Sequence, residues 1–93
     1  MINKKIKKIR RKLDRLDDKM LLIIKKRSLL VDKILSNKTK KNQIIDKQRI
    51  KLILKNIRKK SLANKIDPKI TNRIWKNMIW SYIDYEKRNF KKK

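Results

Sequence analysis

The sequence predicts an all-α protein of three helices, the first of them very long, assembled as an intertwined homodimer. The chain has 93 residues, no Gly and a single Pro, so the tight hairpins of β-rich proteins and Gly-rich phosphate loops lack their usual residues. Its apolar residues recur instead at helical spacing. This length suits one domain, residues 1–93, and so short a chain buries only a modest share of its surface alone. We therefore expect burial against a partner.

The first helix is predicted from about residue 3 to residue 37. Its apolar residues keep a spacing of three or four, with one skipped position at residue 27, and they are Ile6, Ile9, Leu13, Leu16, Met20, Ile23, Leu30 and Ile34. At 1.5 Å per residue this helix is about 50 Å long. A small monomer cannot cover such a stripe, so two copies are expected to bury it by crossing.

Two shorter helices follow a polar loop at Asn37–Gln43. The second helix is predicted over about residues 45–62, and its apolar positions are Ile45, Ile50, Ile53, Leu54 and Ile57. Asp67 and Pro68 mark the start of the third, because Asp is a favoured N-cap and Pro is favoured at the first helical position. This helix continues to about residue 90.

Composition excludes several kinds of chemistry. The chain has no Cys and no His, which are the usual thiolate and imidazole nucleophiles, bases and metal ligands. We therefore expect no metal, nucleotide or covalent cofactor. No apolar run approaches the roughly 20 residues of a membrane span, and the Lys-rich start lacks the apolar core of a secretory signal. A cytoplasmic location is expected.

The formal net charge of +24 first suggests a nucleic-acid partner. The lysines, however, are spread over the whole chain, while the aromatic residues gather in one C-terminal segment and do not alternate with basic patches as base-stacking platforms would. We favour a compositional bias over a nucleic-acid footprint. A membrane-surface role is also disfavoured, because the apolar stripes are needed to close the helix bundle.

Three ionisable residues interrupt the apolar stripes, one on each helix: Arg27, Arg49 and Glu86. A charge in such a position is costly unless it meets an opposite charge, although an Arg can extend its head to water and one Glu can pair with one Arg. Because there are more arginines than carboxylates here, the set favours a pocket for an anionic ligand.

Arg10 lies beside the first stripe, seventeen residues before Arg27, which places the two about 25 Å apart along one helix. They cannot hold one small molecule from one chain. Antiparallel packing of two first helices, about a two-fold axis near Asp17 to Lys19, brings Arg10 of one subunit level with Arg27 of the other. The dimer would then carry two equivalent sites shared between subunits.

These residues resemble the all-α chorismate mutase family. The segment Ile9–Asp17 is similar to the opening of these enzymes, and the order continues through residues 6 to 90 with Arg27, Lys38, Asp46-x-x-Arg49, Asp67, Arg73 and Glu86. The resemblance implies a helical homodimer that converts chorismate to prephenate in aromatic amino-acid biosynthesis. This pericyclic rearrangement needs no nucleophile and no cofactor.

The resemblance also implies roles for the residues. Arg10 of the partner subunit and Arg27 would bind the two substrate carboxylates, and Arg49 would support this basic wall. Lys38 would donate to the ether oxygen and a carboxylate, and Glu86 would donate a second hydrogen bond to that oxygen, for which it must carry a proton. Fixed cations and donors at the breaking C–O bond stabilise the developing negative charge.

Three further residues complete the implied substrate-binding set: Asp46, Ile50 and Tyr82. This chain has Ile50 where chorismate mutases commonly have Glu, Tyr82 where they often have Ser, and Glu86 where Gln is common. Ile50, the pair Tyr82-Ile83 and the spacing from Lys38 to Arg49 are also similar to the isochorismate-pyruvate lyases, a branch of the same fold that eliminates pyruvate to form salicylate. Asp46 and Glu86 do not point to the lyase, so we favour the mutase. A non-catalytic basic helical binding protein is the remaining alternative.

Overall fold

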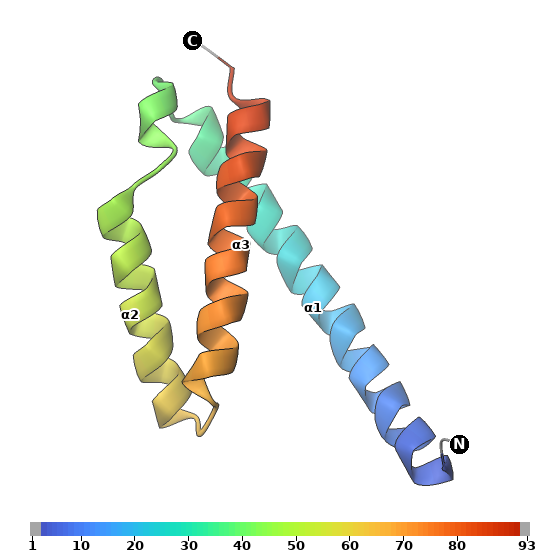
Figure 1. Cartoon of the computed structure of the whole chain (residues 1–93). Coiled ribbons are helices and arrows are strands. Elements are labelled where there is room, and N and C mark those ends of the chain that lie inside the picture. Colours follow the sequence, from blue (N-terminus) through green and yellow to red (C-terminus); the bar gives the residue numbers. More distant parts are fainter. Residues whose placement is uncertain (1–2, 92–93) are drawn as a thin grey trace. The chain divides into compact units, whose positions relative to one another are not determined.

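The computed structural model describes residues 3–91, and these residues form helices without a strand among them. The elements in chain order are α1 (Lys4–Ser36), the short 3-10 helix η1 (Lys41–Gln43), α2 (Lys47–Ala63) and α3 (Pro68–Asn89) (Figure 1). The predicted all-α class and the very long first helix are confirmed. Two local details differ, since α2 begins at Lys47 and the predicted polar loop contains η1.

Contacts within the chain divide it into two compact units. The first unit is Met1–Leu30, which contains α1 up to Leu30. The second unit is Val31–Lys93, which contains the end of α1, η1, α2 and α3.

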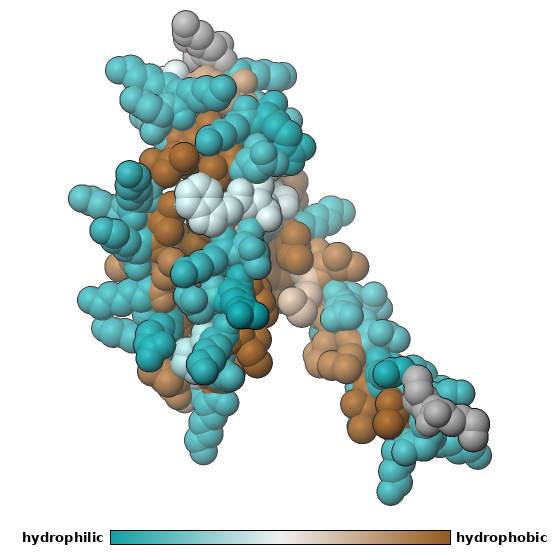
Figure 2. Space-filling view, viewed as in Figure 1, coloured by the Kyte–Doolittle hydropathy of each residue, from teal (hydrophilic) through white to brown (hydrophobic). Residues whose placement is uncertain are grey.

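The apolar stripe of α1 is exposed in the single chain. The eight residues of this stripe are between 41% and 58% exposed: Ile6, Ile9, Leu13, Leu16, Met20, Ile23, Leu30 and Ile34. Figure 2 shows brown, apolar surface along this helix. A contiguous apolar surface of this length on a helix is typical of a face that packs against another chain.

The second unit has a small apolar core. Its α2 and α3 lie side by side and run antiparallel (Figure 1). The buried apolar residues are Leu35 near the end of α1, Ile44 after η1 and Ile83 in α3. Three buried apolar side chains among the described residues are few for a folded unit, because burial of apolar surface is the main stabilising contribution to a fold.

The turn that ends α2 uses a residue other than Gly. Lys65 has φ 57°, in the left-handed region that glycine usually occupies at this position. The amide of Ile66 donates to the carbonyl of Ser61 at 2.8 Å, and the amide of Lys65 donates to the carbonyl of Leu62 at 3.2 Å. This is the Schellman pattern of hydrogen bonds, and it satisfies carbonyls that the helix end leaves free.

The start of α3 agrees with the sequence prediction. The Asp67 side chain accepts a hydrogen bond from the amide of Lys69 at 2.9 Å, and Pro68 is the first helical residue. Close by, the hydroxyls of Ser61 and Thr71 lie 2.7 Å apart and join the end of α2 to the start of α3. These bonds fix the α2–α3 hairpin at the end opposite to Lys38 and Glu86.

Candidate functional site

Lys38 and Glu86 form a part-buried ion pair between the end of α1 and the end of α3. The Lys38 Nζ lies 3.0 Å from Oε1 and 3.3 Å from Oε2 of Glu86, and the two side chains are only 18% and 8% exposed. The inward position that the stripe of α3 predicted for Glu86 is confirmed. A buried carboxylate needs such a cation, and the structure supplies it from a residue 48 positions earlier.

The backbone around Lys38 is held on both sides. Its amide donates to the carbonyl of Leu35 at 3.0 Å, which tightens the last turn of α1. After it, the side-chain oxygen of Gln43 accepts from the amides of Thr39 at 2.8 Å and Lys40 at 3.0 Å. The loop is therefore ordered by η1, and Lys38 is positioned between two hydrogen-bonded segments.

A second bond joins the same two parts of the chain. The Tyr85 hydroxyl donates to Oδ1 of Asp32 at 2.7 Å. This hydrogen bond is the main reason that the pKa of Tyr85 lies above its ordinary value of 10.0; desolvation and the negative charge of Asp32 act in the same direction, and Arg88 acts against them. Sequence reasoning missed this contact, since no spacing signal links residues 53 positions apart.

At the start of α2 the structure assigns Asp46 a local role. Its Oδ1 accepts from the amide of Arg49 at 3.0 Å and so caps the helix. The position of Asp directly before an apolar helical run is the sequence signal for such a cap. The side chain of Arg49 is exposed in the single chain, and Ile50 and Tyr82 are half-buried. Contacts between the substrate and Asp46, Arg49, Ile50 and Tyr82 stay predictions.

The two remaining predicted residues lie in the first unit. Arg10 is exposed on α1. Arg27 is half-buried, and its Nε is buried without an acceptor among the residues that the structure describes. A buried donor without an acceptor costs free energy, which an anionic ligand would relieve.

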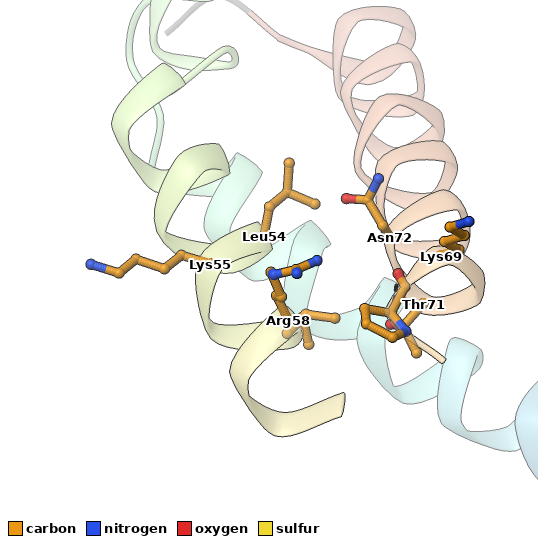
Figure 3. Close-up of a pocket in the computed structure, with 8 residues that line it drawn as sticks. Leu54, Lys55, Arg58, Lys69, Thr71 and Asn72 are labelled. Atoms are coloured by element: carbon orange, nitrogen blue, oxygen red, sulfur yellow. Dashed lines mark hydrogen bonds between the residues drawn. The ribbon is translucent and has the colours of Figure 1, made fainter. Parts of the chain in front are cut away.

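A hollow of about 460 Å³ lies elsewhere on the second unit, between α2 and α3 (Figure 3). Its lining residues are Leu54, Lys55, Ile57, Arg58, Pro68, Lys69, Thr71 and Asn72. None of the eight predicted site residues is among them. The hollow lies between the middle of α2 and the start of α3, and neither Lys38 nor Glu86 lines it.

The Lys38–Glu86 pair suits stabilisation of negative charge better than covalent chemistry. An ammonium group has three donors, and Glu86 does not use all of them. An ionised carboxylate only accepts, so Glu86 becomes a donor when it takes up a proton. The pair can therefore present a fixed cation and, after protonation, a second donor to one oxygen of a ligand.

A protein-family model described as chorismate mutase type II matches residues 9–87. The matched range contains all eight predicted site residues. Neither a curated protein nor a solved structure matches the chain. Among the helices of residues 3–91, none is long and apolar enough to cross a membrane.

Proposed function

Because the chain belongs to the chorismate mutase type II family, we propose that it is an isomerase that rearranges chorismate to prephenate. Family membership supports this activity, and the observation in the structure that supports it most is the part-buried ion pair of Lys38 and Glu86. The biosynthesis of aromatic amino acids is the proposed pathway, and the cytoplasm is the proposed location.

The chemistry requires stabilisation of charge on one oxygen. As the C–O bond of the substrate breaks, negative charge builds on the ether oxygen, so a cation and a hydrogen-bond donor held there favour the transition state over the ground state. Lys38 provides the cation in this proposal. Glu86, in its protonated form, donates a second hydrogen bond to the same oxygen.

The arginines are proposed to hold the substrate carboxylates. The Nε of Arg27, which has no acceptor among the described residues, supports a role in binding an anion. Arg10 reaches the site from the other subunit, and Arg49 adds to the positive wall. Planar guanidinium groups bind carboxylates through two parallel hydrogen bonds, which restricts the substrate to its reactive conformation. The residues proposed to line the remainder of the site are Asp46, Ile50 and Tyr82.

An intertwined homodimer is proposed for the active form. The exposed apolar stripe of α1 and the small core of the second unit support it, since neither is expected in a stable monomer of 93 residues. Residues 1–93 would then work as one domain whose two sites are each shared by both subunits.

Product analysis tests the activity and its alternatives. Purified protein is incubated separately with chorismate and with isochorismate, and we expect prephenate from chorismate. Salicylate and pyruvate from isochorismate alone would instead assign the lyase, and no product from either would favour a non-catalytic binding protein. Lys38→Ala should abolish turnover, whereas Lys41→Ala, which removes an exposed lysine of η1, should leave it near the native rate.

Mixing inactive variants tests the shared site. Arg10→Ala and Arg27→Ala should each be inactive, and after subunit exchange an equal mixture should recover about a quarter of native activity, because half of the dimers are mixed and each has one intact site. An inactive mixture, with exchange verified by mass spectrometry, would show that each site is built within one chain.

A further inference from the structure

Both residues of the Lys38–Glu86 pair lie at the end of a helix. Glu86 is three residues before the last residue of α3, Asn89, and Lys38 is two residues after the last residue of α1, Ser36. Helix ends open more easily than helix interiors, because their last carbonyls have no partner within the helix. The pair therefore joins two segments that the helices themselves hold weakly.

The hydrogen bond between Tyr85 and Asp32 joins the same two segments at a second point. Asp32 lies within α1, four residues before its end, and Tyr85 directly precedes Glu86 in α3. The distance of 2.7 Å from the Tyr85 hydroxyl to Oδ1 of Asp32 is typical of a hydrogen bond to an ionised carboxylate. The carbonyl of Tyr85 also accepts from the side chain of Asn89 at 2.8 Å, which supports the last turn of α3.

Tyr85 and Glu86 leave α3 in different directions. Consecutive residues of an α-helix are about 100° apart around its axis. One contact leaves a helix end free to rotate about it, whereas two contacts in different directions fix both its rotation and its position along the axis. The buried apolar residues nearby, Leu35 and Ile83, do not set this rotation, because apolar burial is non-directional.

We infer that Tyr85 and Asp32 are positioning residues, whose hydrogen bond fixes the rotation of the end of α3 and so holds the Glu86 carboxyl in line with the Lys38 ammonium group. Groups that stabilise a transition state must be held within about 0.5 Å of their productive positions. The effect of this bond on turnover rests on the proposed function, whereas its effect on the Lys38–Glu86 pair does not.

Kinetics test the effect on turnover. Tyr85→Phe removes the hydroxyl and keeps the ring. It should lower kcat with chorismate by about 5- to 20-fold and change KM by less than about twofold, because the arginines proposed to bind the substrate are unchanged. Asp32→Ala should lower kcat equally, and the double variant should lose no more, since both changes remove one bond. Asp32→Asn retains an acceptor oxygen and should stay within about threefold of native.

Unfolding tests the effect on the pair without any substrate. The coupling between Lys38 and Glu86 is obtained from urea unfolding of Lys38→Met, Glu86→Leu and their double variant, first in the native protein and then in the Tyr85→Phe background. This coupling should fall by at least half in the Tyr85→Phe background. A bond that only stabilises the fold would lower the stability of all four proteins equally and leave the coupling unchanged.

Ser81→Ala is the matched control. The Ser81 hydroxyl also forms a hydrogen bond of 2.7 Å, but its acceptor is the carbonyl of Asn77 within α3 itself. This variant should keep kcat and the Lys38–Glu86 coupling near their native values. Circular dichroism checks that each variant remains helical. If Tyr85→Phe does not fold, Asp32→Ala replaces it in both measurements, because it leaves the aromatic ring in place.

Three results would overturn the inference. An unchanged Lys38–Glu86 coupling would show that the bond does not position the pair. A raised KM with an unchanged kcat would show that Tyr85 acts in substrate binding. Additive losses of kcat in the double variant would show that Tyr85 and Asp32 act separately. A native protein without mutase activity refutes the proposed function instead, and the coupling measurement still decides whether the bond holds the pair.

Discussion

Removing one member of the Lys38–Glu86 pair should destabilise the fold more than removing both. The contact is short, at 3.0 and 3.3 Å, and the side chains are 18% and 8% exposed. Lys38→Met leaves the Glu86 carboxylate buried without its cation, which typically costs about 3–5 kcal/mol for a fully buried pair. We expect about 2–3 kcal/mol here, because water still reaches part of the lysine. The double variant Lys38→Met, Glu86→Leu should lie within about 1 kcal/mol of native.

Urea unfolding followed by circular dichroism measures these differences. The native protein, both single variants and the double variant are compared at one protein concentration, because the stability of a dimer depends on concentration. The Arg88–Asp84 pair is the matched control, since its closest atoms are also 3.0 Å apart but its side chains are 65% and 69% exposed. Its coupling energy should be below about 1 kcal/mol.

Equal coupling energies for the two pairs would refute this reasoning. Equal values would mean that water reaches Lys38 and Glu86 in solution as freely as it reaches Arg88 and Asp84. Burial would then contribute nothing to the strength of the Lys38–Glu86 pair. A single-variant cost below about 0.5 kcal/mol would lead to the same conclusion.

Three further outcomes are expected. Glu86→Gln should remain active in measurements of kcat/KM, because an amide also donates a hydrogen bond to the ether oxygen; an inactive Glu86→Gln would exclude this role. Lys65→Gly should raise the free energy of unfolding, measured in urea, by about 0.5–1 kcal/mol, because Lys65 has φ 57° and a side chain with a Cβ is strained in this left-handed conformation. A lower free energy of unfolding would show that Lys65 is not strained. Asp32→Asn should lower the pKa of Tyr85 towards 10.0, measured by tyrosinate absorbance in a Tyr82→Phe background. The bond between Tyr85 and Asp32 should stabilise the fold below the unfolded-state tyrosine pKa and lose this effect as pH rises through the folded-state value.

The sequence predicted features that depend on neighbouring residues, such as the start of α3, but it did not predict contacts between residues far apart in the chain. Asp67 and Pro68 predicted the start of α3 because a cap and a fixed φ act on neighbouring residues. The turn after α2 gave no signal, since Lys65 occupies a position where glycine is usual. Helical periodicity placed Glu86 on an inward face, but it could not identify Lys38 as its partner. Only the ordered likeness to a known family brought these two residues to one site.

The charge composition changes how an ion pair in this chain is interpreted. With four cations for every carboxylate, a lysine or arginine can lie near a carboxylate by composition alone, so proximity by itself carries little information. Burial distinguishes an ion pair that matters for stability from one that does not. An exposed pair such as Arg88–Asp84 contributes little to stability, whereas a buried carboxylate needs a cation beside it. Glu86 is buried within one chain and has its cation there. The burial of Glu86, and not its short distance to a lysine, is therefore the observation that makes the cation of Lys38 necessary.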